Sequence, residues 1–461
     1  MSEKVDVVVI GMGPGGEDAA GKLAEAGLNV VGTEKELVGG ECPYWGCIPS
    51  KMMIRAADLL AEARRIPGFA GSSTVTPDWG PVAKRIREAT DSWNDKVAVD
   101  RFEGKGGHFV RGAGRIIGPS GVSVDGRVFE AGRAVVIATG SAPATPLIPG
   151  LAGVPHWTNR QAIEVEQLPG SLIVLGGGAI GLELAQVFAR FGVAVTVVEA
   201  SARLLAMEEP EASEVVIAVF KREGITVHAG AAVESVERQG SQVTLALKGG
   251  QRLAADQLLV ATGRQSNLKA IGVDALGIDA AQRFVPVDDH LRVKEKIWAI
   301  GDVTGRGNFT HVAIYQSDIA VKDILGIPTE GANYRALPRV TFTDPEVGGI
   351  GLTEAAAREQ GIRVESAIHQ NAAITRGWIH GPGNDGFIKL VVDADRGVLV
   401  GATCVGPRGG DMQSMLELAV REAIPVDRLR HLIYAYPTFY RGIGEATRAV
   451  PARAIQTSRV P

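Results

Sequence analysis

The stretch that decides the fold is Val5-Asp6-Val7-Val8-Val9-Ile10-Gly11-Met12-Gly13-Pro14-Gly15-Gly16. Its first six residues are typical of a buried strand in a parallel sheet. The glycines that follow open a helix whose apolar residues include Ala19, Ala20, Leu23 and Ala26. A strand, a glycine loop and a helix in this order predict a dinucleotide-binding unit.

Each glycine of this loop has a separate task in such a unit. Gly11 permits a tight turn, Gly13 lets the backbone approach a pyrophosphate, and Gly16 lets the helix pack closely on the strand. The next strand ends at Glu34, 23 positions after Gly11, where a carboxylate can accept hydrogen bonds from ribose hydroxyls. These four residues predict a nucleotide site.

The same pattern recurs later in the chain. A strand at 171–175 leads into Gly176-Gly177-Gly178-Ala179-Ile180-Gly181, and the following strand ends at Glu199, again 23 positions after the first glycine. Each half also has a later strand that ends in Ala-Thr-Gly, at Thr139-Gly140 and at Thr262-Gly263. The sequence therefore predicts an internal duplication, in which a second dinucleotide-binding unit is inserted into the first.

Two of the three cysteines, Cys42 and Cys47, are five positions apart, while Cys404 lies in a predicted strand where we expect it to be buried. In an ideal helix, Cα atoms at that spacing are about 8.7 Å apart, whereas a disulfide requires less than about 7 Å. Pro43, Gly46 and Pro49 favour an irregular turn that would allow a bridge. So short a loop gives a fold little stabilisation, so a bridge here would be one that opens and closes. The alternative is a pair of buried thiols.

The remaining segments predict further elements. Apolar spacing between Met52 and Asp100 indicates two surface helices around a Pro- and Ser-rich break at 67–81, and Asp125-Gly126 indicates a β-hairpin. A strand at 296–300 precedes Gly301-Asp302, and a helix is expected over 312–325 with Thr310 near its N-cap. From Tyr334 onward, the pattern of strands (339–342, 387–392, 398–405) and late helices (about 410–422, and from Thr438) indicates an α+β domain.

Composition argues against several classes of partner. The 461 residues have a net charge of −4 and no run of five or six like charges, so neither nucleic acid nor an anionic membrane is indicated. No segment stays apolar for ~20 residues, and the first residues lack the pattern of a signal peptide. Three cysteines fit a reducing compartment, so we expect a cytoplasmic protein.

With these motifs assembled, the chain resembles the pyridine nucleotide-disulfide oxidoreductases, a family of flavoproteins. The resemblance covers essentially the whole length, and the motifs come in the family's order: GMGPGG, GGECPYWGCIPSK, IATGSAP, GGGAIGLELA, VATGR, AIGDVTG, TFTDPEVGGIGLTE and YPTFY. It implies an α/β fold with two Rossmann-like domains, for FAD (1–152 and 271–333) and NAD(P) (153–270). It also implies a C-terminal α+β domain (334–461) that forms a homodimer.

The resemblance implies roles for single residues as well. Cys47 would lie against the flavin, Cys42 would face the substrate, and Lys51 would lie near the flavin ring and pair with Glu183. Gly11, Gly13, Gly16 and Glu34 would hold the adenosine diphosphate part of FAD and Asp302 its ribityl side, and the helix after His311 would direct its N-terminus at the flavin. The other implied cofactor-binding residues are Gly40, Thr139, Gly140, Gly176, Gly178, Gly181, Glu199, Gly263, Gly301 and Ala313. No metal site is expected.

Glu199 bears on the choice of nicotinamide cofactor. A carboxylate at this position accepts the 2′-hydroxyl of NADH but repels the 2′-phosphate of NADPH. Arg203, four positions on, could soften that preference. The sequence favours NADH over NADPH.

The sequence departs from the family's disulfide reductases near the C-terminus. They carry a His-Pro-Thr with an acid five positions after the histidine, whereas this chain has Tyr436-Pro437-Thr438 followed by Arg441. Tyrosine titrates near ~10 against ~6.5 for histidine, so at pH 7 only about one molecule in a thousand would be the phenolate base. Soluble transhydrogenases share the tyrosine but lack the second cysteine, and mercuric reductases add a C-terminal cysteine pair that is absent here.

These departures leave the electron acceptor open. Tyr436, Phe439 and Tyr440, with Tyr44 and Trp45, are expected to form an aromatic mouth for a flat acceptor, or else to belong to a dimer interface. We predict a homodimeric enzyme that passes electrons from NADH through FAD and a Cys42–Cys47 couple to a quinone-like or other small-molecule acceptor. The alternatives are a disulfide reductase with Tyr436 as proton donor, hydride exchange between NADH and NADP, and a flavin-bearing subunit of a larger complex.

Overall fold

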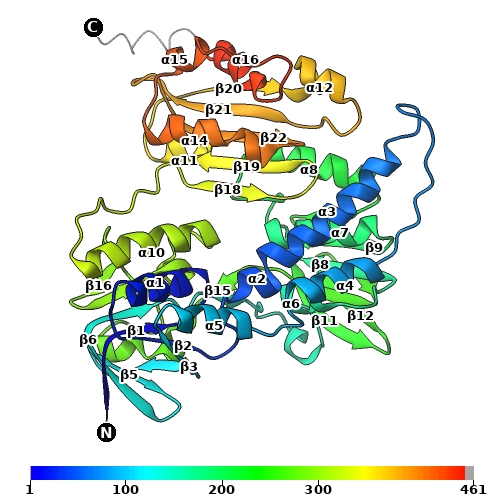
Figure 1. Ribbon diagram of the computed structural model, residues 1–461. Helices are drawn as coiled ribbons and strands as arrows, with labels where there is room; N and C mark the ends of the chain where they lie inside the picture. The colour runs from blue at the N-terminus through cyan, green and yellow to red at the C-terminus, as the bar shows by residue number, and fades with distance from the viewer. Residues whose placement is uncertain (1, 452–461) are drawn as a thin grey trace. The chain divides into compact units, whose positions relative to one another are not determined.

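The computed structural model describes residues 2–451, shown in Figure 1. The chain divides into two compact units, each assembled from three separate segments. Within the described residues, the first unit comprises 2–49, 83–144 and 263–333, and the second comprises 50–82, 145–262 and 334–451. No helix among the described residues is both long and apolar enough to cross a membrane.

The first unit is built on a sheet whose strands run in the order β16-β17-β6-β1-β2-β3. Strands β1, β2, β3, β6 and β17 pair in parallel, and β1 lies at the centre because it pairs with both β2 and β6. Helices α1 and α10 pack so closely that a Cβ on Gly15 would lie 3.0 Å from Ala313. The elements are β1 Glu3–Ile10, α1 Pro14–Glu25, β2 Val30–Glu34, α2 Glu41–Trp45, α5 Lys96–Gly104, β3 His108–Arg111, β4 Gly114–Ile116, β5 Gly121–Val124, β6 Arg127–Ile137, β7 Ala142–Pro143, β15 Arg264–Gln265, α9 Leu268–Ile271, β16 Arg292–Lys294, β17 Ile297–Ala299 and α10 Thr310–Leu325.

The second unit contains a parallel sheet in the order β10-β9-β8-β14 and a five-stranded antiparallel sheet in the order β18-β19-β22-β21-β20. Its elements up to residue 260 are α6 Asn159–Glu164, β8 Ser171–Leu175, α7 Ala179–Arg190, β9 Ala194–Glu199, α8 Pro210–Arg222, β10 Thr226–Ala229, β11 Val233–Gln239, β12 Gln242–Leu247, β13 Arg252–Ala255 and β14 Gln257–Val260. Those after residue 334 are β18 Pro338–Thr341, β19 Glu346–Gly351, α11 Glu354–Glu359, β20 Val364–Gln370, α12 Thr375–His380, β21 Phe387–Asp393, β22 Val398–Gly406, α13 Gly409–Met412, α14 Ser414–Arg421, α15 Val426–Arg430 and α16 Arg441–Ala449.

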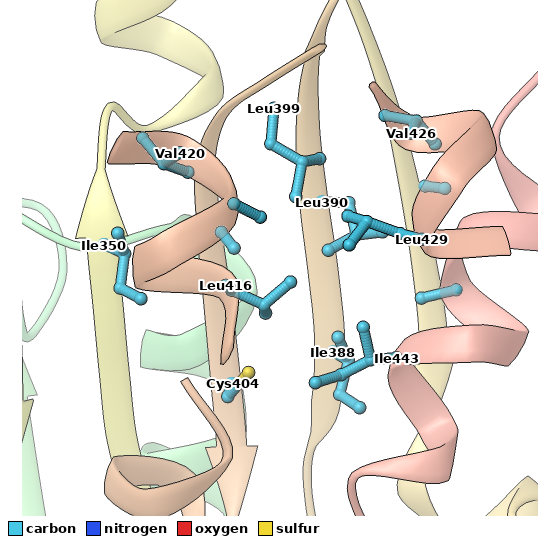
Figure 2. Packing of buried hydrophobic residues seen from close by; sticks show 14 of the residues in the cluster. Ile350, Ile388, Leu390, Leu399, Cys404, Leu416, Val420, Val426, Leu429 and Ile443 are labelled. Atoms are coloured by element: carbon cyan, nitrogen blue, oxygen red, sulfur yellow. The ribbon is translucent and has the colours of Figure 1, made fainter. Parts of the chain in front are cut away.

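The five-stranded sheet packs against helices α14, α15 and α16. Figure 2 shows Leu416, Leu429 and Ile443 from these helices meeting strand residues in one apolar cluster. Cys404 lies in this cluster and is fully buried, which confirms the expectation for it. The cysteine acts here as a small apolar side chain.

The region before residue 105 corrects one expectation. Instead of two helices it forms three, α3 Cys47–Arg64, α4 Gly80–Ala89 and α5. The break between α4 and α5 falls at Asp91, Ser92 and Trp93, whose φ angles are 50°, 54° and 59°. Three consecutive left-handed residues end a helix even though the apolar spacing continues across them.

Two smaller differences concern helix ends. Thr310 is the first residue of α10 and Phe309 holds the N-cap position. The late helix expected over 410–422 is divided into α13 and α14, and the last helix, α16, begins at Arg441. The hairpin at Asp125-Gly126 is confirmed, since β5 and β6 pair antiparallel around it.

Candidate functional site

The carboxyl edge of the first sheet brings the predicted nucleotide residues together. Ile10 at the end of β1 is in register with Thr33 of β2 and Ile137 of β6, and Ala299 of β17 is in register with Ile137. The residues that follow these strand ends therefore share one edge: Gly11–Gly16, Glu34, Thr139-Gly140 and Gly301-Asp302. Ligands of open parallel sheets bind at this edge.

The three loop glycines have distinct surroundings. A Cβ on Gly11 would lie 2.5 Å from the Ala138 carbonyl oxygen, and one on Gly16 would lie 1.9 Å from the Gly11 carbonyl oxygen, so both positions exclude larger residues. A Cβ on Gly13 would meet no atom within 4 Å. The loop therefore offers open backbone at its middle glycine, at the N-terminus of α1, as a bound pyrophosphate requires.

Polar groups along this edge also fit a dinucleotide. The Glu34 carboxylate accepts hydrogen bonds from the backbone nitrogens of Met12 and Glu36, at 3.0 and 2.9 Å, and so is fixed beside the loop. Thr139 Oγ1 is buried and has no hydrogen-bond partner within residues 2–451. A buried hydroxyl without a partner is costly unless a ligand satisfies it. These observations fit FAD at the first edge.

Asp302 follows β17 and lies among polar side chains. It accepts a hydrogen bond from Ser141, whose hydroxyl also accepts one from Arg264 Nε at 2.8 Å. Burial raises the pKa of Asp302 above its usual value of 3.8, while Ser141 and Arg264 oppose that shift. Sequence reasoning missed Ser141 and Arg264, although each directly follows an Ala-Thr-Gly strand end.

The second loop repeats the arrangement of the first. A Cβ on Gly176 or on Gly181 would lie 2.4 Å from a backbone oxygen, whereas one on Gly178 would meet nothing within 4 Å. Gly263 also has open space around it. Glu199 accepts hydrogen bonds from the backbone nitrogens of Gly177 and Ser201, both at 2.6 Å. The strand ends of β8, β9 and β14 thus form a second edge suited to a dinucleotide.

Arg203 is engaged away from this carboxylate. Its guanidinium donates to the carbonyl oxygens of Leu205, Ala206 and Glu208, at 2.8, 2.9 and 2.7 Å. Three of its N–H donors are thus bound within the chain.

The cysteine pair lies at a break between two helices. Helix α2 ends at Trp45, Gly46 has φ −128° and ψ −119°, and α3 begins at Cys47, so the irregular turn that the sequence predicts is present. Cys42 and Cys47 are not joined by a disulfide here, and the Cys42 side chain is hydrogen-bonded to Cys47. The two thiols are thus close enough to interact directly.

The two thiols have different surroundings. Cys47 Sγ lies 3.5 Å from the hydroxyl of Thr310, the first residue of the 16-residue helix α10. Cys42 lines a cavity of about 340 Å³ together with Pro14, Val38, Pro43 and Tyr44. Its hydrogen bond with Cys47 and its burial raise the pKa of Cys42, and the Thr310 hydroxyl opposes that shift. One sulfur adjoins a helix N-terminus and the other adjoins the cavity.

Gly40, His311 and Ala313 lie on the same elements. Gly40 precedes α2 with φ 64°, and a Cβ there would lie 2.9 Å from the Cα of Gly13, so the thiol-bearing turn contacts the first loop. His311 is exposed in the first turn of α10 and its ring stacks on Phe309. Ala313 is buried against α1. Their contacts with a cofactor stay predictions.

In the second unit, Lys51 and Glu183 form the pair that the resemblance implies. Lys51 Nζ lies 2.8 Å from Glu183 Oε2, and the other carboxylate oxygen of Glu183 accepts a hydrogen bond from the backbone nitrogen of Phe342. The Lys51 ammonium also lies 4.6 Å from the centre of the Phe342 ring. Glu183 is only 5% exposed, so its charge depends on these partners.

The aromatic residues expected to form a mouth or a dimer interface differ in burial. Phe439 is buried in the core of its own domain and Tyr440 packs against that core, while Tyr44 and Trp45 are buried in the first unit. Only Tyr436 is largely exposed, at 66%, with the Arg441 guanidinium 5.4 Å from its ring centre.

Comparisons with known proteins agree with this geometry. The pyridine nucleotide-disulphide oxidoreductase family matches residues 5–317, and the dimerisation domain of the same family matches residues 337–447. The chain is 35% identical to a dihydrolipoyl dehydrogenase of Chlorobaculum tepidum over 97% of both chains. It is 32% identical to a mercuric reductase of Bacillus cereus, over 95% of this chain and 70% of that one. Among solved structures, the HOCl-induced flavoprotein disulfide reductase RclA from Escherichia coli superposes with a TM-score of 0.85 at 26% identity, covering 97% of this chain and 100% of that chain.

Proposed function

Because the chain belongs to the pyridine nucleotide-disulphide oxidoreductase family, we propose that it uses NADH to reduce a Cys42–Cys47 couple, which in turn reduces a small-molecule acceptor. FAD, when bound, supplies the two-electron transfer between nicotinamide and sulfur. The observation that carries the proposal is the difference between the two thiols: Cys47 adjoins the N-terminus of α10, and Cys42 lines a cavity.

The cofactor-binding part of the proposal rests on the two strand edges. Gly11, Gly13, Gly16 and Glu34, with Thr139 and Asp302, hold FAD; Gly176, Gly178, Gly181 and Glu199 hold the nicotinamide cofactor. The Lys51 ammonium, held by Glu183, provides a positive charge beside the flavin. The dimerisation domain supports a homodimer, and we place the protein in the cytoplasm.

The thiol step balances without any further reactant. Two electrons and two protons convert a Cys42–Cys47 disulfide into two thiols. When the acceptor takes those two electrons and two protons, the Sγ–Sγ bond forms again. Exchange requires a thiolate at Cys42, whose pKa is raised, so the Thr310 hydroxyl and the positive end of α10 supply local stabilisation of negative sulfur.

NADH is the proposed donor because of the second loop. Two observations support this choice: the Glu199 carboxylate is bound to the loop through the backbone nitrogen of Gly177, and Arg203 donates to three carbonyl oxygens of its own segment. A 2′-phosphate would meet the negative charge of this carboxylate. We expect kcat/KM for NADH to exceed that for NADPH by at least about tenfold, and Glu199→Ala to narrow the ratio. An unchanged ratio in the variant would remove Glu199 as the determinant.

A quinone-like molecule is the proposed acceptor. The cavity beside Cys42 has apolar walls from Pro14, Val38, Pro43 and Val97, and its volume of about 340 Å³ suits a small flat molecule. A quinone takes up protons from the thiols and from water, so it has less need of the histidine that Tyr436 replaces.

Reduction of a disulfide substrate is the second candidate. Tyr436 is 66% exposed, with the Arg441 guanidinium 5.4 Å from its ring centre, so its hydroxyl would be accessible to a disulfide substrate as a proton donor. The dihydrolipoyl dehydrogenase relatives add to this candidate.

An acceptor panel distinguishes these candidates. The holoenzyme is assayed with NADH and menadione, lipoamide, glutathione disulfide or an NADP analogue, alongside Cys42→Ser and the matched control Cys404→Ala, which removes the buried thiol distant from the site in sequence. We expect menadione to be the best acceptor and its turnover to fall at least tenfold in Cys42→Ser but not in Cys404→Ala. Full menadione turnover in Cys42→Ser would show that electrons leave elsewhere.

A further inference from the structure

The cavity beside Cys42 carries three charged side chains that the proposed function does not use. Glu17 comes from α1, Asp91 from the turn between α4 and α5, and Arg101 from α5. Arg101 Nε donates to Glu17 Oε1 at 2.8 Å, and a second guanidinium nitrogen contacts the same oxygen. Because Glu17 and Arg101 offset each other, the Asp91 carboxylate leaves the cavity wall with a net negative charge.

The backbone holds Asp91 at this position. Asp91, Ser92 and Trp93 all have positive φ angles, between 50° and 59°. Such a run of non-glycine residues in the left-handed region costs free energy and is concentrated at functional sites. The turn that carries the uncompensated carboxylate is therefore one that the local sequence would not adopt on its own.

The pKa of Tyr44, another residue of the cavity wall, responds to the same negative charges. Burial raises its pKa, and the carboxylates of Asp95, Glu17 and Asp91 raise it further, while Arg101 opposes them. At this wall the carboxylates outweigh the guanidinium.

We propose that Asp91 selects the electron acceptor by charge, so that the cavity accepts neutral or cationic molecules and disfavours anionic ones. The inference rests on the proposed function, since it assumes that the acceptor reaches Cys42 through this cavity. As in the thiol step described above, the acceptor takes two electrons and two protons, and the Cys42–Cys47 disulfide forms again. Among disulfides the same rule favours neutral lipoamide over anionic glutathione disulfide.

The test compares two quinones that differ by one sulfonate group. The holoenzyme is assayed with 1,4-naphthoquinone and 1,4-naphthoquinone-2-sulfonate, and the ratio of their kcat/KM values is measured for the wild type and for variants. The two quinones differ in reduction potential, but this difference is the same for every protein. It therefore cancels when the ratios of two variants are compared. Asp91→Asn removes one negative charge and keeps the turn, because asparagine tolerates positive φ. Arg101→Gln removes the positive charge, and Asp100→Asn neutralises an α5 carboxylate that pairs with Lys96 and does not line the cavity.

We expect Asp91→Asn to raise the relative use of the sulfonate by about threefold to tenfold at low salt, and Arg101→Gln to lower it, with Asp100→Asn unchanged. In the wild type, kcat/KM for the sulfonate should rise as salt is added, because screening weakens the repulsion. Equal ratios in all four proteins, or a salt effect of the opposite sign, would overturn the inference.

The two proposals fail in different ways. If Cys42→Ser keeps full turnover with both quinones, the acceptor is not reduced at Cys42 and the proposed function fails, and the inference with it. If Cys42→Ser is inactive but Asp91→Asn leaves the ratio unchanged, only the charge selection is wrong.

Discussion

The two glycine loops have the same backbone geometry, but the helices that follow them differ in the partners of an equivalent acidic residue. In both, the first and third glycines approach backbone oxygens, the middle glycine is open, and a carboxylate 23 positions on is bound to the loop. Seven positions after the first glycine, α1 carries Asp18 and α7 carries Glu183. Asp18 accepts hydrogen bonds from Lys22 and from Ser317 of α10, whereas Glu183 holds Lys51. The two glycine loops therefore share their backbone geometry, whereas the helices that follow them have different partners.

The largest expected effect comes from filling the third glycine. A Cβ at Gly16 would lie 1.9 Å from a backbone oxygen, and one at Gly181 would lie 2.4 Å from one. We expect Gly16→Ala to cost about 3 kcal/mol or more and Gly181→Ala somewhat less, as for overpacked cores. Thermal unfolding measures the loss of stability in both variants. Gly224→Ala is measured alongside them: Gly224 has open space around it and a φ of +80°, so this variant reports the cost of positive φ without a steric clash. A Gly16→Ala protein with wild-type stability would contradict the geometry.

Removing the lysine partner should cost more unfolding free energy at Glu183 of α7 than at the equivalent Asp18 of α1. The Glu183 side chain is 6% exposed and that of Asp18 is 28% exposed. Removing Lys51 leaves Glu183 buried without its cation, so Lys51→Met is expected to lower the free energy of unfolding by about 1–3 kcal/mol. Lys22→Met should cost less than about 1 kcal/mol, because Asp18 keeps Ser317 and water. Denaturant unfolding compares the two, and equal losses would show that burial does not separate these pairs.

Substituting the middle glycines should separate the two cofactors. Because Gly13 and Gly178 have no neighbour within 4 Å, alanine at either position should leave the fold intact. We expect Gly13→Ala to weaken FAD binding by about tenfold and Gly178→Ala to raise KM for NADH by a similar factor while FAD stays bound, each corresponding to about 1.4 kcal/mol. FAD content and steady-state kinetics provide the readouts. Loss of FAD in Gly178→Ala would contradict the assignment of FAD to the loop of Gly13 and of the nicotinamide cofactor to the loop of Gly178.

The smallest effect concerns Asp302, which has no counterpart at the second edge. Its pKa in the folded protein is raised above 3.8, so as pH rises above about 4 the unfolded chain releases this proton before the folded one does. Folded stability contributed by the group therefore declines with rising pH through that window. Asp302→Asn should remove this decline in the apoprotein, measured as the melting temperature between pH 4 and 7. A steeper decline in the variant would contradict the sign.

The sequence predicted the parts of the site that a local rule controls. Gly11–Gly16, Glu34, Gly176–Gly181 and Glu199 follow from strand, turn and helix order, and the pairing of Lys51 with Glu183 followed from the family's motifs. The cavity residues Glu17, Asp91 and Arg101 were missed, because the left-handed turn at 91–93 interrupts an apolar spacing that otherwise suggests a continuous helix.

The expectation for Phe439, in an aromatic mouth or a dimer interface, was wrong for a related reason. Phe439 belongs to the apolar core of the C-terminal domain, whereas Tyr44 and Trp45 are buried in the first unit and Tyr44 lines the cavity beside Cys42. The local sequence shows that an aromatic residue is present near a motif. Whether its ring is exposed or buried depends on residues far away in the sequence.

The central claim is that Cys42 and Cys47 act as a redox couple in addition to the flavin. Anaerobic titration of the oxidised holoenzyme with NADH, followed by its absorbance spectrum, tests this most directly. The account predicts uptake of about four electrons per subunit, two for the flavin and two for the sulfurs, falling to about two in Cys42→Ser. Uptake of only two electrons by the wild type would contradict it.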